Sequence, residues 1–182
     1  MSHDGHNMWK GWTLGLIGGA AGVAAMDAFM SRSGKFFEEW APAEAPRQHD
    51  DVSLVGRQSH DDESPTAAVG RLLFEKVMGR EPRSEETKEF LSTLVHWTYG
   101  IKVGGFYGAL RRHRGPDVSG GLAYGAALWA IGDEGAVPLF GLAEGPRGQS
   151  PAMHLKSLAG HFVYGLAMAT ATGLLKNIFR RV

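Results

Sequence analysis

Six ionisable side chains lie inside or at the edges of otherwise apolar stretches of the sequence. They are Asp27, His96, Asp133, Glu134, His154 and His161. Carboxylates and imidazoles can hydrogen-bond one another, can bind zinc, iron or manganese, and can relay protons near neutral pH. Ionisable groups in a membrane cost several kcal/mol unless they are paired or hydrated, so these residues are candidates for a ligand site or a proton pathway.

Three uses of this cluster remain open from the residues alone. The side chains can hold helices together through hydrogen bonds, each worth under ~2 kcal/mol. They can bind a metal or small ligand, with His96, Asp133, Glu134 and His161 as the metal candidates. They can also form a proton or ion pathway. His154 and His161 are seven residues apart and share a helix face, but the chain lacks the tighter ligand spacing of HExxH sites, which weakens the metal hypothesis.

The chemistry of many enzymes is missing from this sequence. The chain has no cysteine, which excludes disulfides, iron–sulfur clusters and thiolate zinc sites. No nucleophile elbow, phosphate loop, dinucleotide fingerprint or zincin motif occurs, so we do not predict an enzyme, and no cofactor can be named. The 19 basic and 19 acidic residues balance, which gives no reason to expect a nucleic-acid partner.

Four apolar stretches must position these side chains, and each approaches the ~20 residues that cross a bilayer. They cover about residues 9–30, 90–110, 118–142 and 151–175. We therefore predict an all-α fold, an integral membrane four-helix bundle forming a single domain over residues 1–182. The mean hydropathy of −0.17 is low for such a protein, because residues 31–93 are largely polar. The alternative is a soluble bundle with glycine-rich core helices.

Residues 31–89 form a long connection between the first two apolar stretches. Residues 31–64 have no clear period and predict a loop. Residues 65–79 predict an amphipathic helix, since Ser64 and Pro65 are a good N-cap and first helical residue. Its apolar residues Val69, Leu72, Leu73, Val77 and Met78 form one stripe. This helix is expected on the membrane surface or against the bundle.

The third apolar stretch contains Gly132-Asp133-Glu134-Gly135 and then Pro138. Two glycines and a proline so close together disfavour a continuous helix. A helix broken at acidic residues is a recurring way to build a binding site in membrane proteins. We therefore expect a break or a re-entrant end here.

Basic residues predict the orientation in the membrane. They concentrate near the N-terminus, in the short loop 111–115 and in the tail 176–181. By the positive-inside rule both termini are cytoplasmic and the connection 31–89 is outside. The first stretch has a poor positive leader and is interpreted as a retained anchor rather than a signal peptide. In this topology all six candidate side chains lie in the outer half of the bilayer. The expected partner of the chain is the lipid bilayer itself.

The glycines show a spacing of four and an internal repeat. The helix-packing candidates are Gly15, Gly19, Gly100, Gly104, Gly108, Gly121, Gly125 and Gly165. Such spacing lets helices approach closely, within one subunit first and between subunits of a homo-oligomer or with a partner second. HxxYG occurs at residues 96–100 and 161–165, and Gly15, Gly19 and Asp27 recur as Gly121, Gly125 and Asp133. Two tandem helical hairpins would explain both correspondences.

A known family shares several of these segments. The runs GGLAYGAALWAIGDEGAVPLFGLAEGP, PAMHLKSLAGHFVYG and HWTYGIKVGGFYGAL resemble the YagU-like family of uncharacterised bacterial inner-membrane proteins. The resemblance covers about residues 94–168 and is weaker over the first apolar stretch. It implies an inner-membrane location and supports Asp133, Glu134, His154 and His161 as signature positions. It implies no activity.

The favoured function is a membrane binding or homeostasis protein whose outer-facing pocket of Asp, Glu and His handles protons or a metal. The alternative is a structural accessory subunit of a larger membrane complex that docks through its glycine faces. A membrane-embedded metallohydrolase ranks last. The first hypothesis requires the polar residues to converge, whereas the second requires an exposed glycine-rich face.

Overall fold

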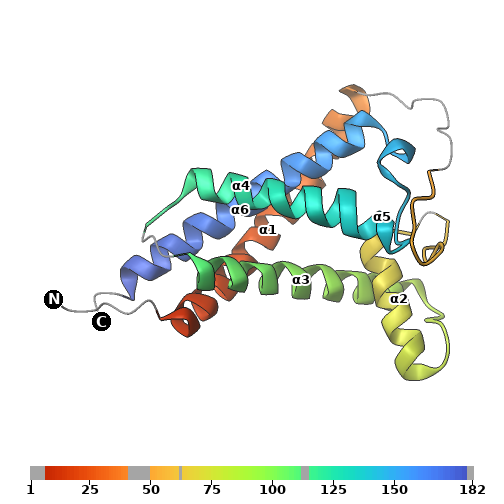
Figure 1. Cartoon of the computed structure of the whole chain (residues 1–182), viewed down its shortest axis with the longest axis horizontal. Helices are drawn as coiled ribbons and strands as arrows, with labels where there is room; N and C mark the ends of the chain where they lie inside the picture. The colour runs from red at the N-terminus through yellow and green to blue at the C-terminus, as the bar shows by residue number, and fades with distance from the viewer. Residues whose placement is uncertain (1–6, 41–49, 62, 112–114, 180–182) are drawn as a thin grey trace. The chain divides into compact units, whose positions relative to one another are not determined.

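The computed structural model of the chain describes residues 7–40, 50–61, 63–111 and 115–179 (Figure 1). These residues form helices and connecting segments without any strand, which confirms the all-α prediction. In chain order the helices are α1 (Met8–Trp40), α2 (Pro65–Met78), α3 (Glu85–Leu110), α4 (Val118–Leu128), a π-helix (Trp129–Ala136), α5 (Val137–Leu139), a 3₁₀ turn (Pro146–Gly148) and α6 (Pro151–Ile178).

The chain divides into two compact units. Unit 1 consists of Met1–Gly34, Tyr99–Ala126 and Leu158–Val182, and unit 2 of Lys35–Thr98 and Ala127–Ser157. Helices α3 and α6 each contribute one part to unit 1 and another part to unit 2. Unit 1 therefore contains most of α1 and most of α4, while unit 2 contains α2, the π-helix and α5.

Two helices of the described chain are long and apolar enough to cross a membrane. They are α1, over Met8–Gly34, and α6, over Pro151–Ile178. The sequence predicts four such helices, but α3 is not apolar enough and the third stretch is divided among α4, the π-helix and α5. Two helices of this kind are weak support for a membrane location, because a signal sequence or the core helix of a soluble protein has the same length and composition.

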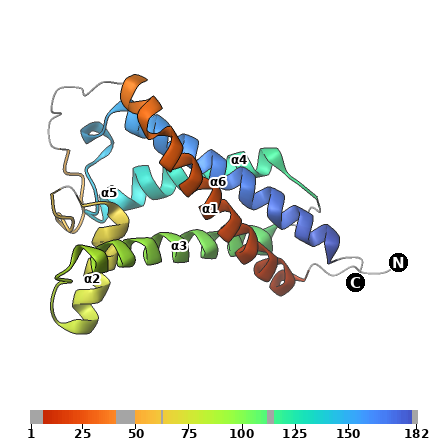
Figure 2. The ribbon, with the colours of Figure 1, turned by 180° about the vertical axis from the view of Figure 1, so that it is seen from behind.

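Within unit 1, α1 and α3 come into direct backbone contact at their glycines. Gly15 lies against the carbonyl of Gly104 and the Cα atom of Gly108. A Cβ atom built at Gly19 would lie 2.7 Å from the carbonyl oxygen of Gly100. Figure 2 shows the resulting crossing of α1 over the C-terminal part of α3. The spacing of four in both helices produces this close approach.

Unit 1 repeats this packing between α4 and α6, with a difference in register. Gly121 lies against the carbonyl of Gly165, and Gly125 against that of His161. In the sequence repeat, Gly121 corresponds to Gly15 and Gly165 to Gly100. Since Gly15 contacts Gly104 rather than Gly100, the two pairs of helices differ in register by about one helical turn.

In unit 2, local signals define the ends of α2. The Ser64 side chain accepts a hydrogen bond from the backbone N–H of Ala67, and Pro65 occupies the first turn. At the other end Gly79 adopts φ 65°, and its N–H donates to the carbonyl of Glu75. A left-handed residue after the last turn favours glycine. The observed helix thus spans nearly the same residues as the helix expected at 65–79.

The expected break in the third apolar stretch is not found. The backbone stays helical from Val118 to Leu139, but residues Trp129–Ala136 form a π-helix between α4 and α5. A π-helix is a wider helix with hydrogen bonds from residue i to i+5, and it is frequent at functional sites. The Gly132–Gly135 segment is therefore accommodated by widening the helix. The helical part ends at Phe140, followed by Gly141 at φ 66°.

The segment before α2, expected as an irregular loop, is fixed to the segment after α5. Leu54 N–H donates to the Leu139 carbonyl at 2.9 Å, and Gln58 and Ser59 both donate to the Gly141 carbonyl. The loop prediction for residues 31–64 is wrong for residues 31–40, which are the end of α1, and residues 41–49 and 62 lie outside the described residues. Residues 50–61 lack regular secondary structure. They are bonded to the chain at Leu139 and Gly141, at and just after the end of α5.

Candidate functional site

The six candidate side chains are divided between the two units. Asp27 on α1 and His161 on α6 belong to unit 1, whereas His96 on α3 belongs to unit 2. Asp27 is exposed, and His96 and His161 are half-buried. The remaining three, Asp133, Glu134 and His154, gather in unit 2 where the π-helix meets the start of α6.

His154 makes the shortest of these contacts and uses both of its ring nitrogens. Its Nδ1 lies 2.6 Å from Oε1 of Glu134, and its Nε2 lies 2.8 Å from the carbonyl oxygen of Pro146. The side chains of His154 and Glu134 are only 22% and 17% exposed. The imidazole is therefore held between a carboxylate and a backbone carbonyl, with little room for water.

The contacts of His154 determine how many hydrogens the Glu134–His154 pair carries. A backbone carbonyl only accepts hydrogen bonds, so Nε2 of His154 must carry a hydrogen. One further hydrogen must lie between Nδ1 and the Glu134 oxygen, because two lone pairs would repel each other at 2.6 Å. The pair is then either imidazolium with carboxylate, or neutral imidazole with carboxylic acid. In both forms it holds one shared proton.

Asp133 bonds to a different residue of α6, the helix that carries His154. The Ser157 hydroxyl donates a hydrogen bond of 2.6 Å to Oδ2 of Asp133. His154 and Ser157 are three residues apart and lie on one face of α6. Asp133 and Glu134 are consecutive, and the wider π-helix turns through a smaller angle per residue than an α-helix does. The widening thus helps both neighbouring carboxylates reach the same face of α6.

The acceptor for His154 is positioned by Asp50, a residue for which the sequence provided no signal. The Asp50 carbonyl accepts from Gly145 N–H at 2.7 Å, and its carboxylate accepts from Arg147 N–H at 3.0 Å. Its own N–H donates to Oε2 of Glu144 at 3.0 Å. Asp50 therefore makes three hydrogen bonds to residues 144, 145 and 147, which flank Pro146. We refer to these three bonds as the Asp50 latch.

The predicted metal site is not assembled in the described part of the chain. No group of three or more Asp, Glu or His side chains in those residues is close enough together to hold a metal ion. Both ring nitrogens of His154 are already engaged. The structure therefore forms two polar pairs, Glu134 with His154 and Asp133 with Ser157. Ser157 was recognisable from its spacing to His154, but Pro146 and Asp50 were not.

A second polar cluster in unit 2 surrounds a buried arginine of α2. Arg71 is 5% exposed. Its Nε and Nη2 donate to Glu63 at 3.0 Å, its Nη1 donates to Glu75 at 2.9 Å, and its Nη2 also donates to the Gln58 carbonyl. Burial raises the pKa of Glu63, but hydrogen bonds from Arg71 and from His60 N–H outweigh it, so this pKa lies below its ordinary value. The hydrogen bond to Glu63 in turn raises the pKa of Arg71. The cluster is fully paired and ties α2 to the preceding segment.

The repeated HxxYG element links helices in unit 1. The Tyr164 hydroxyl, from the second copy, donates at 2.7 Å to the carbonyl of Gly100, the last residue of the first copy. Tyr164 is 3% exposed, whereas Tyr99 of the first copy is 52% exposed. The two copies therefore do not occupy equivalent environments, and the second tyrosine has a structural role.

Comparison with known proteins adds no relative from which a function could be transferred. No protein-family model, no curated protein and no solved structure matches this chain. The functional interpretation therefore rests on the residues and geometry described above.

Proposed function

We propose that this chain is an integral membrane protein that exchanges a proton at the Glu134–His154 pair. The proposed arrangement is a four-helix membrane bundle with both termini in the cytoplasm and the pair towards the outer side. The resemblance of residues 94–168 to the YagU-like family supports a bacterial inner membrane as its location.

The exposure of the two apolar helices supports the membrane assignment. In the most apolar window of α1 only 33% of the residues are buried, and in that of α6 only 44%. The core helix of a soluble bundle would be mostly buried. Large apolar side chains such as Ile17, 52% exposed, and Leu174, 49% exposed, lie instead on the surface of unit 1. Exposed apolar surface on this scale needs a covering medium, and hydrocarbon is the one that matches helices of this length.

The observation that carries proton exchange is the shared hydrogen between Glu134 and His154. The Pro146 carbonyl fixes the hydrogen on Nε2, so a change of protonation must occur on the side that faces Glu134. Histidine is the side chain best suited to gain and lose a proton near neutral pH. Because one hydrogen lies between Nδ1 of His154 and Oε1 of Glu134, its gain or loss involves both side chains.

The neighbouring acid bonds to another residue of α6. Asp133 accepts from Ser157, whereas Glu134 contacts His154. The Asp50 latch fixes the turn that carries the Pro146 carbonyl, which accepts the hydrogen bond from Nε2 of His154.

Nitrogen NMR of histidine-labelled protein in lipid nanodiscs tests this proposal directly. The His154 signals are identified as those lost in His154→Gln. We expect a hydrogen on Nε2 and a second hydrogen at Nδ1 that is shared with the Glu134 carboxyl. Glu134→Gln should change the Nδ1 signal and leave Nε2 protonated, whereas the matched change Glu85→Gln, at an exposed side chain paired with Lys88, should change neither signal. If the Nδ1 signal is the same in the wild type and in Glu134→Gln, the proposal fails.

The accessory-subunit alternative has less support. It needs an exposed glycine face for docking, but Gly15, Gly104 and Gly108 are buried against each other within unit 1. Gly121 and Gly165 are buried in the same way between α4 and α6. The glycine spacing is thus used for packing inside the chain, and a partner would have to bind another surface.

A further inference from the structure

Helix α2 of unit 2 buries a charged residue and exposes apolar residues, the reverse of the pattern of a helix in water. Its arginine, Arg71, is buried at 5% exposure and paired with Glu63 and Glu75. Its apolar residues Leu73 and Val77 are 55% and 80% exposed. A helix on a water-soluble protein buries its apolar stripe and exposes its charges. The outer side of α2 is therefore built to meet an apolar medium.

An apolar hollow continues this surface beside Leu73. Its volume is about 390 Å³, and it is lined by Val55, Gln58, Val69, Leu72, Leu73, Phe140 and Leu142. Gln58 is the one polar residue of this lining. The volume lies in the range of roughly 300–1,000 Å³ that is typical of small-molecule sites. Val55 and Phe140 are 56% and 60% exposed at its rim. The hollow has the size and chemistry to take part of a hydrocarbon chain.

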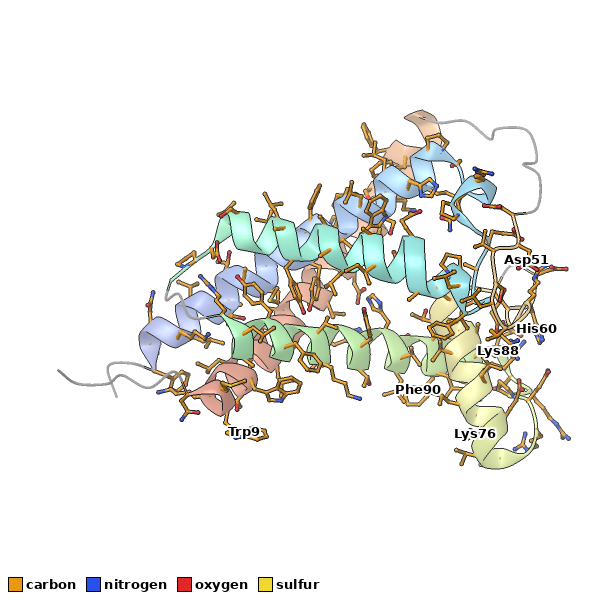
Figure 3. All side chains as sticks on the ribbon, in the orientation of Figure 1. Trp9, Asp51, His60, Lys76, Lys88 and Phe90 are labelled. Carbon is orange, nitrogen blue, oxygen red and sulfur yellow. The ribbon has the colours of Figure 1, made fainter. Side chains whose placement is uncertain are left out.

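One cation lies on the same side of α2. Lys76 is exposed and follows Leu73 by three residues, directly before Val77 (Figure 3). The described residues provide no hydrogen-bond or ion-pair partner for its ammonium group. A lysine on an otherwise apolar face keeps its charge at the membrane–water boundary. There it attracts anionic phosphate, as basic residues of interfacial helices do.

We propose that this surface, formed by Leu73, Lys76, Val77 and the adjoining hollow, binds an anionic phospholipid of the bilayer. The acyl chain enters the hollow, and the lipid phosphate pairs with Lys76. Helix α2 then lies in the interface with its apolar side in the hydrocarbon boundary. The inference rests on the membrane assignment of the proposed function but is independent of the Glu134–His154 pair.

The absence of cysteine from the chain permits a clean test by site-specific labelling. Val77→Cys, labelled with bimane, is placed in nanodiscs whose lipid chains are brominated and therefore quench fluorescence on contact. Ile17→Cys on α1 is the reference for a membrane-spanning position. Glu86→Cys, exposed in the acidic first turn of α3, is the reference for a position in water. All three sites are exposed, so labelling should leave the fold intact, which circular dichroism checks.

The proposal expects quenching at Val77 close to that at Ile17 and well above that at Glu86. In the Val77→Cys background, Lys76→Gln should reduce the preference for brominated anionic over brominated neutral lipid by up to about fivefold, the equivalent of roughly 1 kcal/mol per cation at the surface. Quenching at Ile17 but not at Val77 would overturn this proposal alone, including the case in which disulfide cross-linking shows a second copy covering Val77. Absence of quenching at Ile17 would overturn the membrane assignment itself.

Discussion

The close packing of α1 on α3 makes a quantitative prediction for Gly104→Ala. A Cβ atom at this position would lie 2.7 Å from the Gly15 carbonyl oxygen and 2.7 Å from the Gly19 nitrogen, and closer still to the Gly19 Cα atom. All three are backbone atoms, so no side chain can rotate out of the way. Ordinary contact begins at 3.4 Å, so the two helices must separate locally by more than roughly 0.7 Å. Overpacking of this kind costs about 1–3 kcal/mol.

Alanine also favours the helix by up to about 1 kcal/mol over glycine, and a matched control removes this contribution. Gly34 is in α1 and has nothing within 4 Å of the position of a Cβ atom. Gly34→Ala therefore carries the gain in helix propensity without the clash. The difference between the two variants isolates the steric cost of about 1–3 kcal/mol, which corresponds to roughly 2–12 °C in Tm for a chain of this size.

Thermal unfolding in detergent, followed by circular dichroism, measures this difference. We expect Gly34→Ala to match or exceed the wild-type Tm and Gly104→Ala to fall below both. Equal Tm values for the two alanine variants would show that α1 and α3 do not approach through their glycines. The packing of unit 1 described above would then be wrong.

Three further predictions concern other parts of the chain. Tyr164→Phe leaves the buried Gly100 carbonyl without its donor and should cost about 1–3 kcal/mol of unfolding free energy; an unchanged Tm would contradict the role given to HxxYG. Because the pKa of Glu63 is lowered in the folded chain, its stabilising effect is complete above its unfolded pKa of about 4.3 and is lost as the pH falls through the folded value. Glu63→Gln should therefore lower stability at neutral pH and remove this acid-dependent loss, and parallel pH profiles for the two proteins would refute the assignment. Asp50→Ala removes the carboxylate that accepts from Arg147 N–H, so it should accelerate hydrogen exchange at the Arg147 amide, and unchanged exchange would show that the latch does not hold this turn.

Local sequence signals predicted the helices well where such signals exist. Ser64, Pro65 and Gly79 mark both ends of α2, and the observed bounds agree with them. The end of α1 was placed near residue 30, where the apolar content stops, but the helix continues to Trp40. Backbone hydrogen bonding does not require apolar side chains, so hydropathy marks the end of an apolar stretch rather than the end of a helix.

The candidate site was predictable in its residue types but not in its geometry. The spacing of His154 and Ser157 on one helix face is local, and it was available from the sequence. The Asp50 latch joins residues more than ninety positions apart. A local sequence pattern cannot predict a contact over such a separation. The π-helix was missed for another reason: glycine and proline disfavour an α-helix, but they do not distinguish an interrupted helix from a widened one.

The sequence correspondences between the two halves of the chain do not extend to the Glu134–His154 pair. With the repeat offsets of the sequence, Asp133 corresponds to Asp27 and Ser157 to Ser92, so this acid and this hydroxyl are present in both halves. Glu134 corresponds to Ala28, however, and His154 corresponds to Glu89.

The first half therefore has neither member of the Glu–His pair. The helix pairs α1–α3 and α4–α6 also differ in register by about one turn, so corresponding residues do not face the same neighbours. A metal site built symmetrically from both halves would need matching ligands in each. A shared proton needs only one carboxylate, one imidazole and one carbonyl, and unit 2 provides all three in Glu134, His154 and Pro146. This asymmetry agrees with the proposal of a proton, rather than a metal, at the Glu134–His154 pair.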